Sequence, residues 1–416
     1  MPADKNTRPL EYEKYEAVRS LSDTLNKIVD LDVMMETILT EARRFVRAEA
    51  GSIYGRSGNK LVFSYSQNDW LQSLPEEGRP AGYKNRKLPL TGNSLASYVA
   101  REKTTLNIAD AYDIPLDKPY RFEPEFDRRT GYVTRSVLTM PLNDIRGENI
   151  GVLQVINPLD DKGKVRPFEA DDEELMSIFS STAAMALERT QMSRQMILRT
   201  IKMVELRDPL ETVLHALRVG DLSAMLYECW AAGRNLNPEE LRRDVGHLRM
   251  AAMLHDVGKI GVPDNVLTKH GRLNPQEMEE MRKHVEIGLK LFEPVTTALD
   301  AMIHDVILNH HERWDGTGYP GWLNLNTGLP MAGHFGPDDK PLGKKGEEIS
   351  IFGRVTAVAD VFDTLSSRRT YKDAFDEDLV CQIMLQESGH HFDPELIDCL
   401  LSSLDKAKEI RKLYPE

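Results

Sequence analysis

Two adjacent histidines, His310 and His311, begin the stretch of the chain that is richest in potential chemistry. The stretch runs from Asn309 to Pro320, passes through a turn rich in Gly and Asp, and ends in Gly318-Tyr319-Pro320. Neighbouring side chains on a regular helix point about 100° apart, so both rings can meet one cluster only at a helix end or around a multinuclear centre. The glycines allow the backbone to approach a ligand closely. A plainer alternative fits equally well: a helix end, a turn and two surface histidines.

Further imidazole and carboxylate groups stand on both sides of this stretch. Glu211 and His215 are four residues apart, which places them on one face if their segment is helical. His255 and Asp256 are adjacent, and His284 begins a later helical pattern. Each of these residues alone is more often a solvated or hydrogen-bonded surface group than a ligand, so the weight of the prediction lies in their combination.

Asp360 lies inside an otherwise apolar helical segment, Val355 to Asp363. A carboxylate in such a segment is costly to bury unless it is paired or ligates a metal. We therefore expect Asp360 to be a better ligand candidate than the more peripheral Asp363. The resulting mixture of imidazole and carboxylate groups suits iron or manganese better than calcium.

His255-Asp256, His310-His311 and Gly318-Tyr319-Pro320, in this order, resemble the motifs of the HD-GYP family of metal-dependent phosphodiesterases. The resemblance runs from about Glu205 to the C-terminus. It implies an all-α HD-type helical domain over residues 208–416, with two or three divalent metal ions, iron or manganese. The metal ligands it implies are Glu211, His215, His255, Asp256, His284, His310, His311 and Asp360.

The resemblance also divides these ligands between the metal ions. One ion would be held by His215, His255, Asp256 and Asp360. Asp256 would bridge to a second ion, held by His284, His310 and His311, and Glu211 would help to hold a third. The same resemblance assigns substrate contacts to Lys259, Tyr319, Arg369 and Lys372.

Asp256 and Lys259 are the implied catalytic residues. Bound metal ions supply a hydroxide nucleophile at neutral pH, and Lys259 would stabilise the leaving oxygen, because an ordinary lysine is a weak acid near neutrality. The family substrate is cyclic di-GMP, opened to pGpG and in some members cut on to GMP. Two alternatives remain open: a cyclic dinucleotide receptor with little turnover, and a phosphodiesterase for another cyclic dinucleotide such as cyclic GMP-AMP.

Two segments of the C-terminal half stand apart from this site. Residues 321–348 are longer than the usual family connector, and we expect either a lid or substrate-selecting loop or a surface insertion without a role. His390-His391 is a second tempting pair. Asp393 before Pro394 indicates a helix N-cap, so we assign that pair to structure.

The first half of the chain has a different texture. Short runs rich in β-branched and aromatic residues predict strands near 51–54, 61–64, 137–141 and 150–156. Helical patterns begin near Leu21, with Asp32 as a candidate N-cap, and cover 95–101. This is an α/β pattern of a sheet with flanking helices.

Ala48–Tyr54 and Gly151–Asn157 resemble GAF domains, which are regulatory modules that bind small ligands or mediate dimerisation. The resemblance implies a flexible N-terminus over residues 1–15 and a GAF sensor domain over 16–190. Asn157, Phe168 and Asp172-Glu173 partly echo a motif of GAF domains that bind cyclic nucleotides, but Pro158 stands where that motif has Lys. A ligand-binding sensor and a structural dimerisation module therefore both fit.

Residues 173–207 form a long helical pattern without Gly or Pro. We expect its apolar residues to lie near one stripe: Leu175, Ile178, Phe179, Met185, Met192, Met196, Ile201 and Val204. Such a length predicts a connecting helix between domains that pairs as a parallel coiled coil in a homodimer. The alternative is a single helix that packs on its own domain.

The composition agrees with an α+β multidomain protein. A chain of 416 residues predicts two or three domains, and the net charge of −13 argues against a protein that coats DNA or RNA. Cys229, Cys381 and Cys399 have no paired spacing and predict buried thiols of a reducing compartment. No apolar run approaches the ~20 residues of a membrane span, and the start has no signal-peptide pattern, so we expect a cytoplasmic protein.

Overall fold

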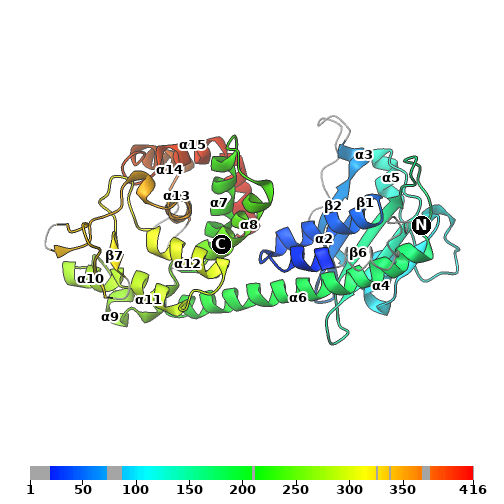
Figure 1. Ribbon diagram of the computed structural model, residues 1–416, viewed down its shortest axis with the longest axis horizontal. Coiled ribbons are helices and arrows are strands. Elements are labelled where there is room, and N and C mark those ends of the chain that lie inside the picture. Colours follow the sequence, from blue (N-terminus) through cyan, green and yellow to red (C-terminus); the bar gives the residue numbers. More distant parts are fainter. Residues whose placement is uncertain are drawn as a thin grey trace, which may run out of the picture. The chain divides into compact units, whose positions relative to one another are not determined.

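The computed structural model describes residues 19–72, 87–208, 211–324, 327–336, 339–367 and 375–415. The chain divides into two compact units, one up to Ser193 and one from Arg194 (Figure 1). The predicted flexible segment 1–15 lies outside the described residues.

The first unit contains a sheet with flanking helices. Its elements are α2 (Leu31–Phe45), β1 (Ala48–Ser57), β2 (Lys60–Asn68), α3 (Asp69–Gln72), β3 (Lys87–Pro89), α4 (Leu95–Glu102), β4 (Leu106–Ile108), η2 (Ala111–Asp113), α5 (Glu125–Thr130), β5 (Val137–Asn143), β6 (Asn149–Pro158) and α6 (Ala170–Glu205).

The six strands form one antiparallel sheet in the order β3-β2-β1-β6-β5-β4. The four predicted strands are confirmed as β1, β2, β5 and β6. Alternation along the strands gives the sheet two apolar faces. Ile53 and Leu153 pack with α2 and α6, whereas their neighbours Tyr54 and Val152 pack with α4. The helices thus cover both faces, as the α/β pattern predicts.

The N-terminal cap of α2 differs from the prediction. The side chain of Asp30 accepts hydrogen bonds from the backbone N–H groups of Asp32 and Val33. Asp30 is therefore the N-cap, and Asp32 lies one residue inside the helix, where its negative charge favours the helix N-terminus.

Helix α6 confirms the predicted long connecting helix, with 36 residues. Its apolar side chains do not form one stripe, which corrects the prediction. Phe179, Ile201 and Val204 are buried. An opposite stripe of exposed apolar side chains follows spacings of seven and four residues: Ile178, Met185, Met192, Met196 and Met203.

The second unit is helical apart from a short pair of strands, within the described residues. Its elements are α7 (Val213–Ala231), α8 (Pro238–Ala252), η3 (Val257–Gly261), α9 (Asp264–Leu267), α10 (Pro275–Arg282), α11 (His284–Leu291), α12 (Ala298–Asn309), β7 (Leu323–Asn324), β8 (Leu329–Pro330), η5 (Gly346–Glu348), α13 (Ile351–Ser366), α14 (Glu377–Gln386), α15 (Pro394–Ser402) and α16 (Leu404–Leu413).

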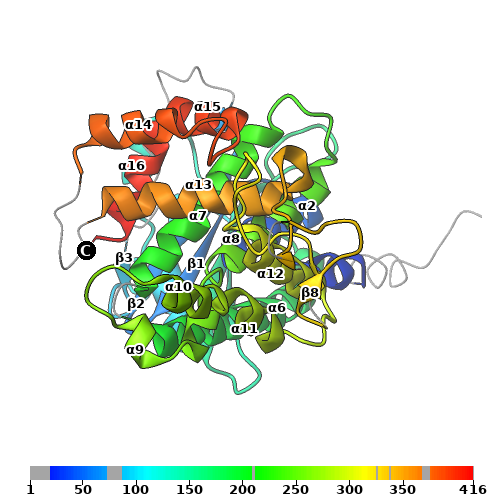
Figure 2. The same cartoon turned by 90° about the vertical axis from the view of Figure 1, so that its left-hand side faces the viewer.

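The core of this unit lies between α7, α8, α12 and α13, which pack on one another (Figure 2). Each of these helices begins with a side chain that accepts a hydrogen bond from the first turn: Thr212, Asn237, Thr297 and Ser350. Such caps satisfy backbone N–H groups that have no partner within the helix. The helix starts, and the side chains near them, are thereby fixed in position.

The segment 321–348 is tied down at both ends. The buried carboxylate of Glu312 accepts hydrogen bonds from the backbone N–H groups of Gly321 and Lys344. The Lys344 ammonium lies 2.6 Å from Asn309 Oδ1. The two ends of the segment are therefore bound to the residues that flank His310-His311. Whether the segment acts as a lid remains a prediction.

His334 and Asp393, the residue that follows Phe392 after His390-His391, both have structural partners. His334 stacks on Trp322, with ring centroids 4.4 Å apart. Asp393 caps α15 by accepting a hydrogen bond from Glu395 N, which confirms the predicted N-cap.

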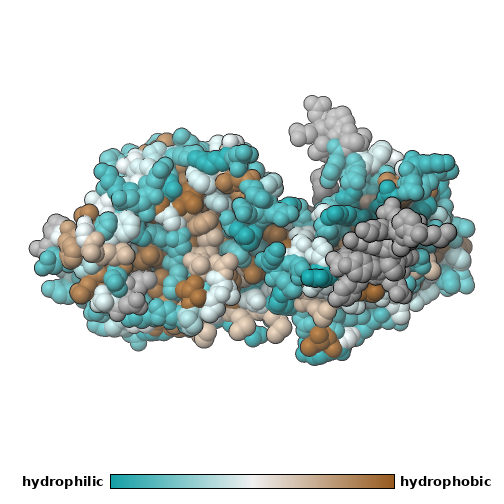
Figure 3. Space-filling view, viewed as in Figure 1, coloured by the Kyte–Doolittle hydropathy of each residue, from teal (hydrophilic) through white to brown (hydrophobic). Residues whose placement is uncertain are grey.

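The three cysteines differ in burial. Cys399 is buried, but Cys229 and Cys381 are only half-buried, which corrects the expectation of three buried thiols. Among the described residues, no helix is both long and apolar enough to cross a membrane. On the face drawn in Figure 3, hydrophilic residues predominate and apolar residues form scattered patches.

Candidate metal centre

Helix ends bring the predicted ligands together. His215 lies in the first turn of α7, His255 and Asp256 directly precede η3, and His284 is the first residue of α11. Helix α12 ends at Asn309, so His310 and His311 follow its last turn, as the spacing argument required. Their ring centroids are 4.0 Å apart.

One set of side chains, here called the His310 group, consists of Asp256, His284, His310 and His311. One potential ligand atom from each lies within 4.8 Å of the others. Asp256 Oδ1 is 3.1 Å from His284 Nε2, 3.5 Å from His310 Nε2 and 3.9 Å from His311 Nε2.

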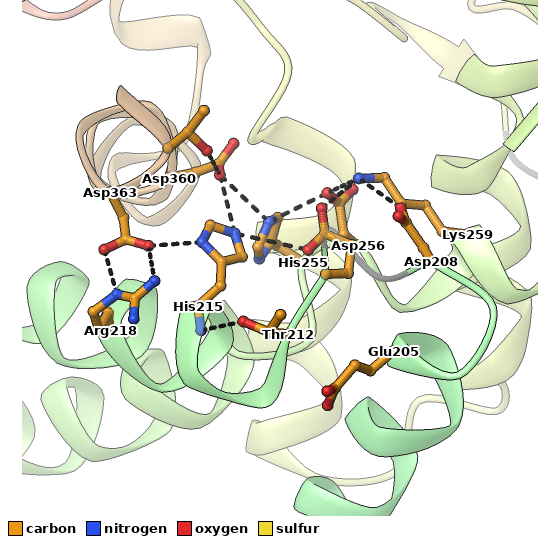
Figure 4. A network of polar contacts seen from close by, with 12 residues as sticks. Glu205, Asp208, Thr212, His215, Arg218, His255, Asp256, Lys259, Asp360 and Asp363 are labelled. Carbon is orange, nitrogen blue, oxygen red and sulfur yellow. Dashed lines mark hydrogen bonds and ion pairs between the residues drawn. The ribbon is translucent and has the colours of Figure 1, made fainter. Parts of the chain in front are cut away.

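A second set, the His215 group, consists of Glu211, His215 and His255, whose ligand atoms also lie within 4.8 Å of one another. Asp360 Oδ1 on α13 faces it, 3.4 Å from His215 Nε2 and 3.9 Å from His255 Nε2 (Figure 4). Glu211 lies just before the N-cap Thr212, not on the helix face we expected. Its carboxylate nevertheless reaches within 3.7 Å of His215 Nε2.

The outer ring nitrogens orient these histidines. Nδ1 of His255 lies 2.8 Å from a backbone carbonyl oxygen, Nδ1 of His284 2.7 Å and Nδ1 of His310 3.0 Å. A carbonyl only accepts, so each Nδ1 carries a proton and Nε2 is the ring nitrogen that faces the centre. This is the usual arrangement of histidines that ligate metals.

The inner atoms of the centre lack aligned hydrogen bonds. Nε2 of His255, His284 and His310 and Oδ1 of Asp256 are buried with no hydrogen-bond partner among the described residues. The short separations of these atoms from one another are therefore contacts without hydrogen-bond geometry. Buried polar atoms normally have partners, so the residues present fit one or more metal ions.

Asp363, which the sequence placed at the periphery, is fully buried behind His215. Its Oδ2 lies 2.8 Å from His215 Nδ1, and Arg218 donates hydrogen bonds to both of its oxygens, at 2.6 and 2.9 Å (Figure 4). Arg218 also donates to the Tyr414 carbonyl, at 3.2 Å. Asp363 therefore orients His215 from outside, while Asp360 faces the side of His215 where a ligand atom is needed. The spacing of three residues between the two aspartates was the available signal.

Lys259 joins the two groups electrostatically. Its ammonium lies 2.7 Å from Asp256 Oδ2 and 2.5 Å from Glu211 Oε1. Burial opposes the lysine charge, but Asp256 and Glu211 outweigh it and hold the pKa of Lys259 well above its usual value. The pKa of Asp256 is held well below its usual value by Lys259 and His255, against the effect of burial.

The close approach of η3 to α11 depends on Gly258. A Cβ atom at this position would lie 1.8 Å from the His284 carbonyl oxygen and 2.5 Å from Gly288 N. No side chain fits that space without moving the backbone, and the contact sets Asp256 against His284.

Two of the four predicted substrate contacts, Lys259 and Tyr319, are among the described residues. Tyr319 stacks on His311, with ring centroids 4.7 Å apart, so its ring lines the centre. Burial raises the pKa of its hydroxyl, which is therefore protonated near neutrality. Arg369 and Lys372 lie outside the described residues.

The GAF unit holds a cavity of about 220 Å³ on the α4 side of its sheet. Its walls are mainly aromatic and aliphatic, including Tyr54, Phe63, Phe122 and Phe126. Asp127 is the acidic residue on this wall, and it already accepts hydrogen bonds from Thr134 and Tyr112. The described lining residues include no lysine or arginine.

The residues that echo a cyclic-nucleotide motif have structural partners. Asn157 is buried and donates to Glu49, the Tyr132 hydroxyl and the Val133 carbonyl. Phe168 lies in the core beneath α6. Asp172 pairs with Arg166 at the start of α6.

Comparison with known proteins agrees with this architecture. A GAF domain model matches residues 30–187, and an HD domain model matches residues 212–365. The fold and the site thus define a GAF domain followed by an HD domain that carries a candidate metal centre. Because its HD domain carries the Gly318-Tyr319-Pro320 turn, the chain belongs to the HD-GYP family.

Several bacterial proteins of known name are similar to the chain. The 3'3'-cGAMP-specific phosphodiesterase 2 of Vibrio cholerae is 31% identical over 325 residues, which is 75% of this chain and 56% of that protein. A cyclic di-GMP phosphodiesterase of the same organism is 36% identical over 201 residues, 47% of this chain and 37% of that protein. A cyclic di-GMP phosphodiesterase of Thermotoga maritima is 33% identical over 218 residues, 52% of this chain and 50% of that protein. The chain thus spans about half the length of the relatives it matches.

Proposed function

We propose that the HD domain hydrolyses a phosphodiester bond of a cyclic dinucleotide in a metal-dependent reaction, with Asp256 and Lys259 as catalytic residues. The observation that carries the proposal is the convergence of buried Nε2 atoms and Asp256 Oδ1 without hydrogen-bond partners among the described residues. A receptor without turnover has no need of such a ligand set.

The metal ions would be two or three in number, iron or manganese, and would supply an activated water and neutralise phosphate charge. Asp256 would serve both groups, since its Oδ1 lies 3.1 Å from His284 Nε2 and its Oδ2 lies 3.4 Å from His255 Nε2. Lys259 stays protonated, so it stabilises a leaving oxygen by its charge and does not serve as a strong acid. Tyr319 offers its hydroxyl and ring beside His311. Arg369 and Lys372 are retained as proposed phosphate contacts.

The favoured substrate is cyclic di-GMP, opened to pGpG, with further cleavage to GMP as an open alternative. Cyclic GMP-AMP is the second candidate, because the relative that matches 75% of this chain is named for that nucleotide. A receptor role with little turnover is the third.

The deciding experiment is product analysis. The protein, purified without oxygen and supplied with iron or manganese, is incubated with cyclic di-GMP and, in parallel, with cyclic GMP-AMP, and the nucleotides are separated. Linear dinucleotide or mononucleotide supports the proposal, and the ratio of the two rates assigns the substrate. Two intact cyclic dinucleotides beside a fully metal-loaded protein would favour the receptor role.

The GAF domain is proposed to regulate this activity by binding a small, uncharged and largely apolar molecule. An apolar cavity of ~150 Å³ can hold benzene, and the cavity here is somewhat larger, at about 220 Å³. A phosphate group would find no cationic side chain among the described lining residues. Thermal unfolding of the whole chain with indole and with cyclic GMP tests this idea: indole is expected to stabilise the protein and cyclic GMP is not. Stabilisation by cyclic GMP alone would refute the apolar assignment.

A homodimer through α6 is the proposed assembly. The exposed stripe from Ile178 to Met203 has spacings close to a heptad, which suits a parallel pair of helices. Met192→Glu is expected to convert a dimer into a monomer in a light-scattering mass measurement. Gln195→Glu is the control, because it adds the same charge at an exposed position about 100° from Met196 around the helix, outside the stripe. A monomeric unmodified protein at high concentration would remove the proposal.

A further inference from the structure

The cationic side chain of Arg282 lies beside the candidate metal centre, and the proposed reaction assigns it no role. Arg282 is the last residue of α10, two residues before His284. Its guanidinium lies over the Tyr319 ring, 4.8 Å from the ring centroid, and Tyr319 in turn stacks on His311. The guanidinium is therefore one aromatic contact away from a candidate metal ligand.

Arg282 has hydrogen-bonding capacity to spare. One terminal nitrogen, Nη1, donates to Glu279 at 3.1 Å. Nε is buried and has no hydrogen-bond partner among the described residues. An arginine offers five N–H donors in a rigid planar fork. The side chain is 40% exposed, so an incoming ligand can reach it.

The positive charge of Arg282 is only partly neutralised. The Glu279 oxygen that it contacts is also 3.0 Å from the ammonium of Lys340, in the segment 339–348. One carboxylate thus serves two cations. The incompletely neutralised charge of Arg282 can therefore attract an anion next to Tyr319.

We propose that Arg282 binds the second phosphodiester of the cyclic dinucleotide, the one that is not being cleaved. This inference rests on the proposed function. A cyclic dinucleotide carries two phosphodiesters in one ring, so placing one at the metal centre puts the other nearby. The guanidinium fork matches two phosphate oxygens, a geometry that lysine does not reproduce. Arg282 is thus a substrate-binding residue that a substrate with one phosphodiester does not use.

The test compares two substrates in two variants of the metal-loaded protein. Arg282→Ala is expected to lower kcat/KM for the cyclic dinucleotide about 10- to 100-fold, chiefly through KM, as for loss of a charged hydrogen bond. Hydrolysis of bis(p-nitrophenyl) phosphate, which has a single phosphodiester, is expected to change less than about threefold, and metal content is expected to stay the same. Lys283→Ala is the matched control, because Lys283 is adjacent, 53% exposed and paired with Glu280.

Each other outcome overturns either the proposed role of Arg282 or the proposed function. Equal losses with both substrates mean that Arg282 acts through Tyr319 and His311 and not on a second phosphate. No loss with either substrate removes Arg282 from the substrate site. If the unmodified protein cleaves bis(p-nitrophenyl) phosphate but no cyclic dinucleotide, the proposed function fails. The Kd of cyclic di-GMP then decides the role of Arg282, and an unchanged Kd in Arg282→Ala overturns it.

Discussion

The His310 group and the His215 group lie side by side at His255-Asp256, yet they hold protons in opposite ways. Burial lowers the pKa of His310 and holds that of His311 well below its usual value. Burial also opposes charge on His215, but hydrogen bonds with Asp360 and Asp363 outweigh it and raise the pKa to about 10. The number of carboxylates facing each ring decides its protonation state.

This difference predicts an order of metal loading. Near neutral pH His310 and His311 present neutral nitrogens, whereas His215 carries a proton that a cation must displace. The pKa of His255, raised to about 9 by Asp256 against burial, adds a second proton on that side. Because metal ligands must be deprotonated, we expect the His310 group to take up its ion first.

Asp256→Ala should abolish the difference in metal loading between the two groups. Asp256 belongs to the His310 group, and its Oδ2 also lies 3.4 Å from His255 Nε2 of the His215 group. We expect metal content to fall towards zero and kcat/KM to fall by more than about 100-fold, since loss of an outer partner alone costs about 10- to 100-fold. Elemental analysis and turnover of the cyclic dinucleotide check this. Full activity with full metal content in the variant would falsify the site assignment.

Gly258→Ala should damage the His310 group through the backbone. The added Cβ would meet the His284 carbonyl at 1.8 Å, so η3 must move away from α11. We expect a loss of about 3 kcal/mol in the free energy of unfolding and a weakened His310 group, measured by denaturant titration and metal content. Gly55→Ala is the control for the added methyl group, because that glycine has no positive φ and the nearest atom a Cβ would meet is the flexible end of the Met35 side chain, at 3.1 Å. An unchanged Gly258→Ala protein would show that this contact does not position Asp256.

Asp363→Ala should separate the two groups. Removing the partner of His215 Nδ1 is expected to weaken metal binding at the His215 group about 10- to 100-fold and to leave the His310 group loaded. Metal titration followed by calorimetry distinguishes the two steps. Asp405→Ala, at a fully exposed side chain, controls for the lost charge. Equal weakening of both steps would mean that Asp363 supports the fold and not one ligand.

The smallest expected effect is on the pH dependence of folding stability and of metal binding. His215 binds its proton more tightly in the folded, metal-free state than in the unfolded chain, whose histidine pKa is ~6.5. Its contribution to stability is therefore present below about pH 6.5 and is lost as pH rises through about 10. Metal binding to the His215 group should release roughly two protons near pH 7.5, and binding to the His310 group should release fewer. Calorimetry in buffers of different ionisation enthalpy counts them, and equal release from both groups would contradict the comparison.

The resemblance to HD-GYP motifs predicted the candidate ligands, and the structure brings their side chains together. Their role as metal ligands stays a prediction. The sequence also predicted that adjacent histidines need a helix end, which α12 provides at Asn309. The sequence did not predict that Asp363 orients His215. Position along a helix indicates a face, but only the packing of α13 on α7 shows that His215 lies between two aspartates.

Other differences have equally local causes. Strands β3 and β4 have three residues each, too few to produce a periodic pattern. The stripe predicted on α6 merged two sides of the helix, because apolar composition does not distinguish a core contact from an exposed methionine. Arg282 carried no motif signal, and its contact with Tyr319, 37 positions later, depends on how the intervening helices α11 and α12 fold back.

The hydrogen bond from Arg218 to the Tyr414 carbonyl has a consequence for protein synthesis. The His310 group is complete in the nascent chain once His311 has emerged, whereas the outer support of His215 needs a residue about a hundred positions later. At translation rates of about 5–20 residues per second, that interval lasts roughly 5–20 s. During this time the growing chain contains every residue of the His310 group but lacks the outer support of His215.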